Sequence, residues 1–194
     1  VGMLLYGSGM RLLECLSLRV KDVDLERGEI RIRRGKGGVD RVTVLPEAVR
    51  PGLAAHLGRV RARHGEDLAA GGGRVAMPGA LDRKLPKAAA EWPWQWVFPA
   101  ARTYRDRVTG ERRRHHLHPS AMQRAMVVAV RRSEVGKRAS CHTLRLVRRR
   151  VAFGSRHLVG ARRTGRASWT GPNRLQRLQQ YPLGGSVSGQ LKTS

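Results

Sequence analysis

A chain of 194 residues has room for one domain of ordinary size, or for a small domain with a tail. Its 39 lysines and arginines against 14 aspartates and glutamates give a net charge of +25, so we expect a polyanionic partner, with nucleic acid first among the candidates. No apolar run approaches the ~20 residues of a membrane-spanning helix and no signal-peptide pattern opens the chain, so we expect no membrane anchor. Cys15 and Cys141 lack the spacing of a disulfide framework or a zinc site, which predicts small buried thiols in a reducing cytoplasm.

A short amphipathic helix is the first predicted element, after a turn bounded by glycines. Arg11 and Glu14 stand three residues apart and therefore share one face of this helix, where an exposed surface pair is the simplest interpretation. Polar and apolar residues then alternate over 29–33 and 41–45, which predicts a β-hairpin with Lys36 at its tip. The apolar positions of the helix are Met10, Leu13, Leu16 and Leu18.

The middle of the chain predicts a long helix followed by a tryptophan-rich segment. Residues 46–70 open with Pro46 and carry an apolar stripe, and three glycines then end the helix. Residues 91–99 contain three tryptophans within five positions, and we expect a basic, turn-rich loop over 102–114. The stripe consists of Val49, Leu53, His56, Leu57 and Val60.

Two further helices are predicted near the end of this region. The first runs over 119–134, with Met122, Met126, Val127 and Val130 expected to face inward. The second begins after Ser140, a suitable N-cap, and places His142 and Arg145 on one face. Three separated elements thus present Arg11, Lys36 and the His142/Arg145 pair. Two guanidiniums can hold one phosphate while a lysine and a histidine move protons, although arginine and lysine are weak signals in so basic a chain.

The order of these segments resembles the catalytic domain of tyrosine recombinases. The resemblance rests on residues 5–14 (LYGSGMRLLE), 18–24 (LRVKDVD), 35–41 (GKGGVDR) and 142–145 (HTLR), and it covers residues 1–145. It implies an α+β, mainly helical domain with a small antiparallel sheet, and a DNA strand-cleavage and rejoining activity through a phosphotyrosine intermediate. The resemblance implies no ATP, metal or other cofactor.

The resemblance also assigns roles to single residues. Arg11 and Arg145 would hold the scissile phosphate, and Lys36 would be the general acid on the hairpin. His142 would handle a proton, and Glu14 would support the site from behind. The implied partner is DNA, in an assembly of four protomers and in a bacterial cytoplasm.

Residues 91–118 further resemble the insertion of integron integrases. In that family branch the insertion receives unpaired bases of folded single-stranded cassette sites, and Trp94, His115 and His116 match the relevant positions. A tryptophan core cluster with exposed histidines is the alternative interpretation. A zinc site at His115, His116 and His118 is disfavoured because a fourth ligand with suitable spacing is missing.

The tail, residues 146–194, departs from the family pattern. It holds ten basic residues and no acidic residue, and the family's later motifs are absent. Tyr181 is a poor nucleophile candidate because Pro182 would break the helix that presents it. We therefore expect a reading-frame slip after Arg145, a poorly ordered tail, a chain truncated at both ends, and no DNA cleavage or exchange of C-terminal helices between protomers. The alternative is a non-catalytic basic DNA-binding remnant. A basic ribosome-associated protein is disfavoured, because it would not need the family's ordered set of residues, Arg11, Lys36, His142 and Arg145.

Overall fold

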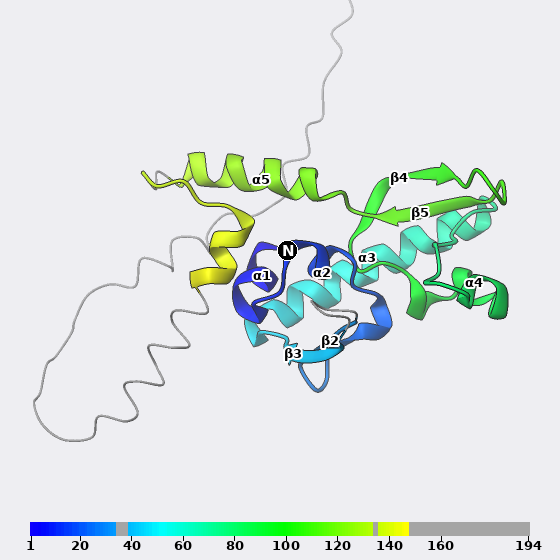
Figure 1. Cartoon of the computed structure of the whole chain (residues 1–194), viewed down its shortest axis with the longest axis horizontal. Coiled ribbons are helices and arrows are strands. Elements are labelled where there is room, and N and C mark those ends of the chain that lie inside the picture. The colour runs from blue at the N-terminus through cyan, green and yellow to red at the C-terminus, as the bar shows by residue number, and fades with distance from the viewer. Residues whose placement is uncertain (34–38, 134–135, 148–194) are drawn as a thin grey trace, which may run out of the picture. The chain divides into compact units, whose positions relative to one another are not determined.

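Helices and two small antiparallel sheets make up the computed structural model, which describes residues 1–33, 39–133 and 136–147 (Figure 1). This is the predicted α+β, mainly helical class. Lys36, Tyr181 and the tail from residue 148 lie outside the described residues, so the predictions for them stay predictions.

The chain opens with two short helices that enter the main core. α1 (Gly2–Ser8) buries Leu4 and Leu5 almost completely, and Gly9 ends it with a positive φ of 68°. The sequence pattern predicted a glycine-bounded turn before the first helix and did not predict α1; burial of the two leucines stabilises this helix in spite of its glycines at positions 2 and 7. α2 (Leu12–Leu16) is the core of the predicted helix with Arg11 as its N-cap.

A three-stranded antiparallel sheet confirms the predicted hairpin. Its strands are β1 (Val23–Asp24), β2 (Glu29–Ile32) and β3 (Arg41–Val44), and Ile30 pairs with Thr43. Ile30 and Ile32 are buried because alternate residues of β2 face the core. A short 3-10 turn, η1 (Val20–Asp22), leads into β1.

The predicted long helix is also confirmed. A 3-10 turn, η2 (Glu47–Val49), precedes α3 (Arg50–Ala69), which buries Leu53, Val60 and His64. The ring of His56, on the same helix, stacks on Phe98 and shares a hydrogen bond of 2.8 Å with the carbonyl oxygen of Val97. These contacts attach the tryptophan-rich segment to α3.

The basic segment over 102–114 is not the predicted loop but part of a second β-hairpin. β4 (Pro99–Arg105) pairs with β5 (Arg112–His116) beside the C-terminal half of α3 (Figure 1). The prediction was wrong because the strands carry no apolar alternation, and ion pairs with distant carboxylates hold them in place. Before this hairpin lie α4 (Leu81–Lys84), η3 (Ala88–Ala90) and η4 (Trp92–Trp94).

The final described helices agree with the predictions except at two positions of α5. α5 (Pro119–Arg132) packs Met122 and Met126 against the core. Val127, predicted to face inward, is 48% exposed, and Val130 is only partly buried and is not among the residues that pack against the core. Residues 141–147 are helical, and the Ser140 hydroxyl accepts the backbone N–H of Thr143, as expected of an N-cap.

Candidate functional site

Arg11 is held in place by Glu14 at the start of α2. The backbone of Arg11 is extended, with φ −74° and ψ 155°, as is usual for an N-cap residue. Its N–H donates to Glu14 Oε2 at 2.7 Å, and its guanidinium Nη1 donates to Glu14 Oε1 at 2.8 Å. The three-residue spacing therefore makes a helix-capping contact rather than a surface pair. The Arg11 side chain nevertheless stays 38% exposed.

Glu14 also binds a second arginine, which the sequence analysis did not single out. Arg41, the first residue of β3, donates from Nη2 to Oε2 at 2.6 Å and from Nη1 to Oε1 at 3.1 Å. Burial alone would raise the pKa of Glu14, but the hydrogen bonds from Arg41 and Arg11 outweigh it and lower the pKa to about 2. Glu14 thus supports Arg11 as an ionised carboxylate. The sequence signal for Arg41 was the alternation in β3, which places Arg41 on the same strand face as Thr43. That face is turned toward α1, because the Thr43 hydroxyl donates to the carbonyl oxygen of Ser8.

A similar arrangement recurs eight residues later in the chain, at the start of η1. Asp22 accepts the backbone N–H of Arg19 at 3.3 Å and the Nε–H of Arg33 at 2.6 Å. Arg33 directly follows β2 and Arg41 opens β3, so the two carboxylates, Asp22 and Glu14, hold both strands of the hairpin at the ends from which the predicted turn would start.

The helix formed by residues 141–147 shares a hydrophobic core with α2. Cys141 and Cys15 belong to the same buried cluster, and Leu144 packs against it. Burial raises the pKa of the Cys15 thiol to about 12, and the neighbouring Cys141 adds to this effect. His142 is exposed and Arg145 is partly buried on this helix. The structure therefore brings the helix of His142 and Arg145 to the core that also supports Arg11, although these segments are more than 120 residues apart.

Trp96 is the centre of the aromatic cluster. Its indole N–H donates to the carbonyl oxygen of Arg114 at 3.1 Å, and the guanidinium of Arg19 lies 3.4 Å from its ring centroid. The rings of His115 and His116 lie 5.9 Å and 5.2 Å from it. Burial, followed by neighbouring positive charges, lowers the pKa of His116 despite its backbone hydrogen bond. The two histidines are thus grouped with Trp96, a tryptophan that the sequence analysis did not distinguish from its neighbours.

Trp94 stands apart from the two histidines in its contacts. It is partly buried, and the Nζ of Lys21 lies 2.7 Å from its ring centroid. A base that stacks on this face of Trp94 must displace Lys21.

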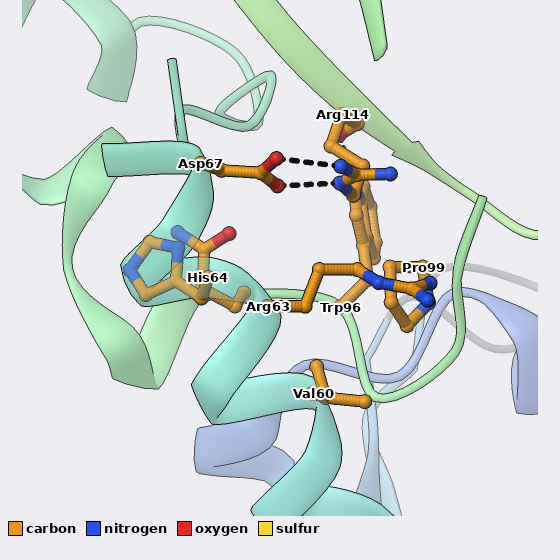
Figure 2. A pocket seen from close by; sticks show the side chains of 8 residues that line it. Val60, Arg63, His64, Asp67, Trp96, Pro99 and Arg114 are labelled. Atoms are coloured by element: carbon orange, nitrogen blue, oxygen red, sulfur yellow. Dashed lines mark hydrogen bonds and ion pairs between the residues drawn. The ribbon is translucent and has the colours of Figure 1, made fainter. Parts of the chain in front are cut away.

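Two arginines of the β4–β5 hairpin are structural. The side chain of Arg113 is 6% exposed and is paired with Asp82 and Glu111 at 3.0 Å and 2.8 Å. Arg114 forms a bidentate pair with Asp67 of α3, with both distances 2.7 Å (Figure 2). That pair forms part of the wall of a small pocket between α3 and the hairpin, so these two charged groups are already partnered with each other. The exposed arginines of the hairpin are Arg102, Arg105, Arg107 and Arg112.

Among the residues that the structure describes, no group of three or more His, Cys, Asp or Glu side chains is placed to hold a metal ion. Over the described ranges, no helix is both long and apolar enough to cross a bilayer.

Comparison with known proteins identifies the family. The model of the phage integrase family matches residues 1–150. The chain belongs to this family. An integrase/recombinase of Escherichia coli and one of Pseudomonas aeruginosa are each 47% identical to this family member over 142 residues, which cover 73% of this chain and 42% of the relative. The chain therefore spans less than half the length of these two relatives.

More distant relatives agree with the fold. The tyrosine recombinase XerA of Thermococcus kodakarensis is 46% identical over 55 residues, which cover 28% of this chain and 20% of that protein. A crystal structure of XerA recombinase superposes with a TM-score of 0.51 at 20% identity, and the match covers 78% of this chain and 41% of the other. This phage integrase family member thus has the recombinase fold over its described part.

Proposed function

We propose that this chain is the phosphodiester-binding part of a site-specific DNA recombinase of the tyrosine recombinase type. The observation that carries the proposal is Arg11, an exposed guanidinium held at a helix N-terminus by the ionised Glu14. Membership of the phage integrase family and a net charge of +25 support DNA as the partner.

Each proposed catalytic residue has a distinct task. Arg11 and Arg145 hold the nonbridging oxygens of one phosphate and stabilise the charge of a pentacoordinate transition state. Lys36 protonates the leaving 5′ oxygen, and His142 orients or deprotonates the nucleophile. The common core of α2 and the 141–147 helix supports this grouping.

We propose further that this chain binds DNA without cleaving it, because the tail offers no suitable nucleophile. A nicked suicide duplex, which traps the covalent 3′-phosphotyrosyl adduct, tests this directly. We expect no adduct with this chain, whereas the same substrate should trap the Escherichia coli relative. An adduct that disappears in the Tyr181→Phe variant would overturn the absence of cleavage.

An integron-type substrate is the finer part of the proposal. We propose that Trp94, His115 and His116 receive an unpaired base of a folded single-stranded site. The packing of His115 and His116 on Trp96 supports a shared role for the two histidines, and binding at Trp94 would require displacement of Lys21. Because stacking contributes ~1–3 kcal/mol per base, Trp94→Ala should weaken binding about 5- to 150-fold when the unpaired base is present. It should have no effect on a fully paired duplex. Trp92→Ala, a partly buried neighbour, is the matched control.

Residues 1–145 are proposed as the recombinase part and 146–194 as an aberrant tail. The absence of acidic residues after Arg145 supports a shifted reading frame. Sequencing the gene in independent isolates tests this; an intact frame with the same tail would remove the idea.

A non-catalytic basic DNA-binding remnant is the second candidate, favoured by the charge of the tail. The two candidates differ in specificity. A recombinase part should prefer integron recombination sites to random DNA at matched salt, whereas a remnant should bind both equally and lose affinity steeply as salt rises. Tetramer formation on the recombination site would further support the first.

A further inference from the structure

Two arginines share the carboxylate of Glu14 in a geometry that limits their separation. Arg11 Nη1 lies 2.8 Å from Oε1, and Arg41 Nη1 lies 3.1 Å from the same oxygen. The two nitrogens are therefore less than about 6 Å apart, which is within the reach of one phosphate group and its hydrogen-bonding shell. The strand and the helix that carry them are distant in sequence, so the fold alone creates this pair.

The cations lie at the surface and the anion beneath them. The side chains of Arg11 and Arg41 are 38% and 37% exposed, whereas that of Glu14 is 11% exposed. The contacts with Glu14 use one N–H of Arg11 and two of Arg41, out of five on each guanidinium. The three side chains together carry one net positive charge, which matches the single negative charge of a phosphodiester.

A purely structural arginine in this chain has different surroundings. Arg113 is 6% exposed and lies among Asp82, Asp106 and Glu111, so carboxylates outnumber the cation. At Glu14 the ratio is reversed, because one carboxylate serves two guanidiniums. Such an excess of cationic charge in partly exposed side chains is unfavourable for the free protein and is relieved when an anion binds.

We infer that Arg41 is a second phosphate ligand, which binds the same DNA phosphate as Arg11. This inference rests on the proposed function and adds a residue to the proposed site. It also explains why Glu14 supports both arginines: one carboxylate orients two donors toward a common acceptor.

Salt-matched binding to a duplex that carries an integron recombination site tests the inference. We expect Arg41→Gln to raise the apparent Kd about tenfold, and Arg11→Gln to raise it by a similar factor. Arg41→Lys, which keeps the charge, should recover part of the loss. Arg27→Gln is the control, because the Arg27 side chain is 79% exposed and its ion pair with Asp24 is long, at 3.9 Å. This variant should change the Kd less than twofold.

A double variant separates binding from support of Glu14. In the Glu14→Gln background the ion pair with Arg41 is already lost, and Arg41→Gln should still weaken binding about tenfold if it contacts phosphate. An effect of Arg41→Gln that vanishes in this background, or equals that of Arg27→Gln, overturns the inference.

The same measurements separate this inference from the proposed function. If Arg11→Gln weakens DNA binding while Arg41→Gln does not, only this inference fails. If the unchanged protein binds no DNA, the proposed function fails as well. Equal urea midpoints of each pair of compared variants establish that both are folded.

Discussion

Replacing Glu14 by glutamine should reduce stability in a pH-dependent manner. The Glu14→Gln substitution keeps the size of the side chain but removes the charge that pairs with Arg11 and Arg41. A carboxyl pKa lowered from 4.5 to about 2 by folding corresponds to about 3 kcal/mol, at ~1.4 kcal/mol per pKa unit. Both arginines are more than a third exposed, so solvent screening reduces this to about 2 kcal/mol at pH 7.

The sign of the pH dependence follows from the direction of the pKa shift. The folded state has the lower pKa, so the stabilisation is complete above the unfolded value of 4.5 and is lost as the pH falls toward about 2. The difference in unfolding free energy between the natural chain and Glu14→Gln should therefore shrink to about half by pH 3.

Urea unfolding followed by tryptophan fluorescence at pH 7, 5 and 3 measures this difference. Asp24→Asn is the matched control, because Asp24 is 46% exposed and its ion pair with Arg27 is 3.9 Å long. That variant should differ from the natural chain by at most a few tenths of a kcal/mol at each pH. A Glu14→Gln variant that is as stable as the natural chain at pH 7, or equally destabilised at pH 7 and pH 3, would refute the reasoning.

Three further substitutions test the packing around the site, each by its urea midpoint at pH 7. Arg113→Ala removes the buried cation from Asp82 and Asp106 and leaves Glu111 with Arg74 alone, so it should cost about 3 kcal/mol, with a smaller loss at pH 3. An unchanged midpoint would contradict the structural role of Arg113. Trp96→Phe removes the N–H donated to the Arg114 carbonyl and weakens the contact with Arg19, so we expect a loss of about 1–2 kcal/mol. Leu16→Ala opens a cavity at a fully buried position and should cost about 2–5 kcal/mol, whereas Leu13→Ala, at a 58% exposed position, should cost under 1 kcal/mol.

Local patterns in the sequence determined several elements of this protein. The alternation around residues 29–33 and 41–45 predicted the first hairpin, and the apolar stripes predicted α3 and α5. These predictions succeeded because the repeat of a helix or strand decides which residues share a face, and that repeat is visible in any short window. The order of the motifs around Arg11 and His142 likewise indicated the family before any contact was known.

Contacts between distant residues were decided only by the tertiary structure. Arg41 reaches Glu14 across 27 positions, and Arg114 reaches Asp67 across 47, in a chain with 39 basic residues to choose from. The alternation in β3 places Arg41 on one strand face but does not name its partner, and β4 and β5 show no apolar alternation that would have predicted strands around Arg114. The partner of a charged side chain depends on which surfaces pack together. Packing follows from burial of the whole apolar core, to which distant parts of the chain contribute at once.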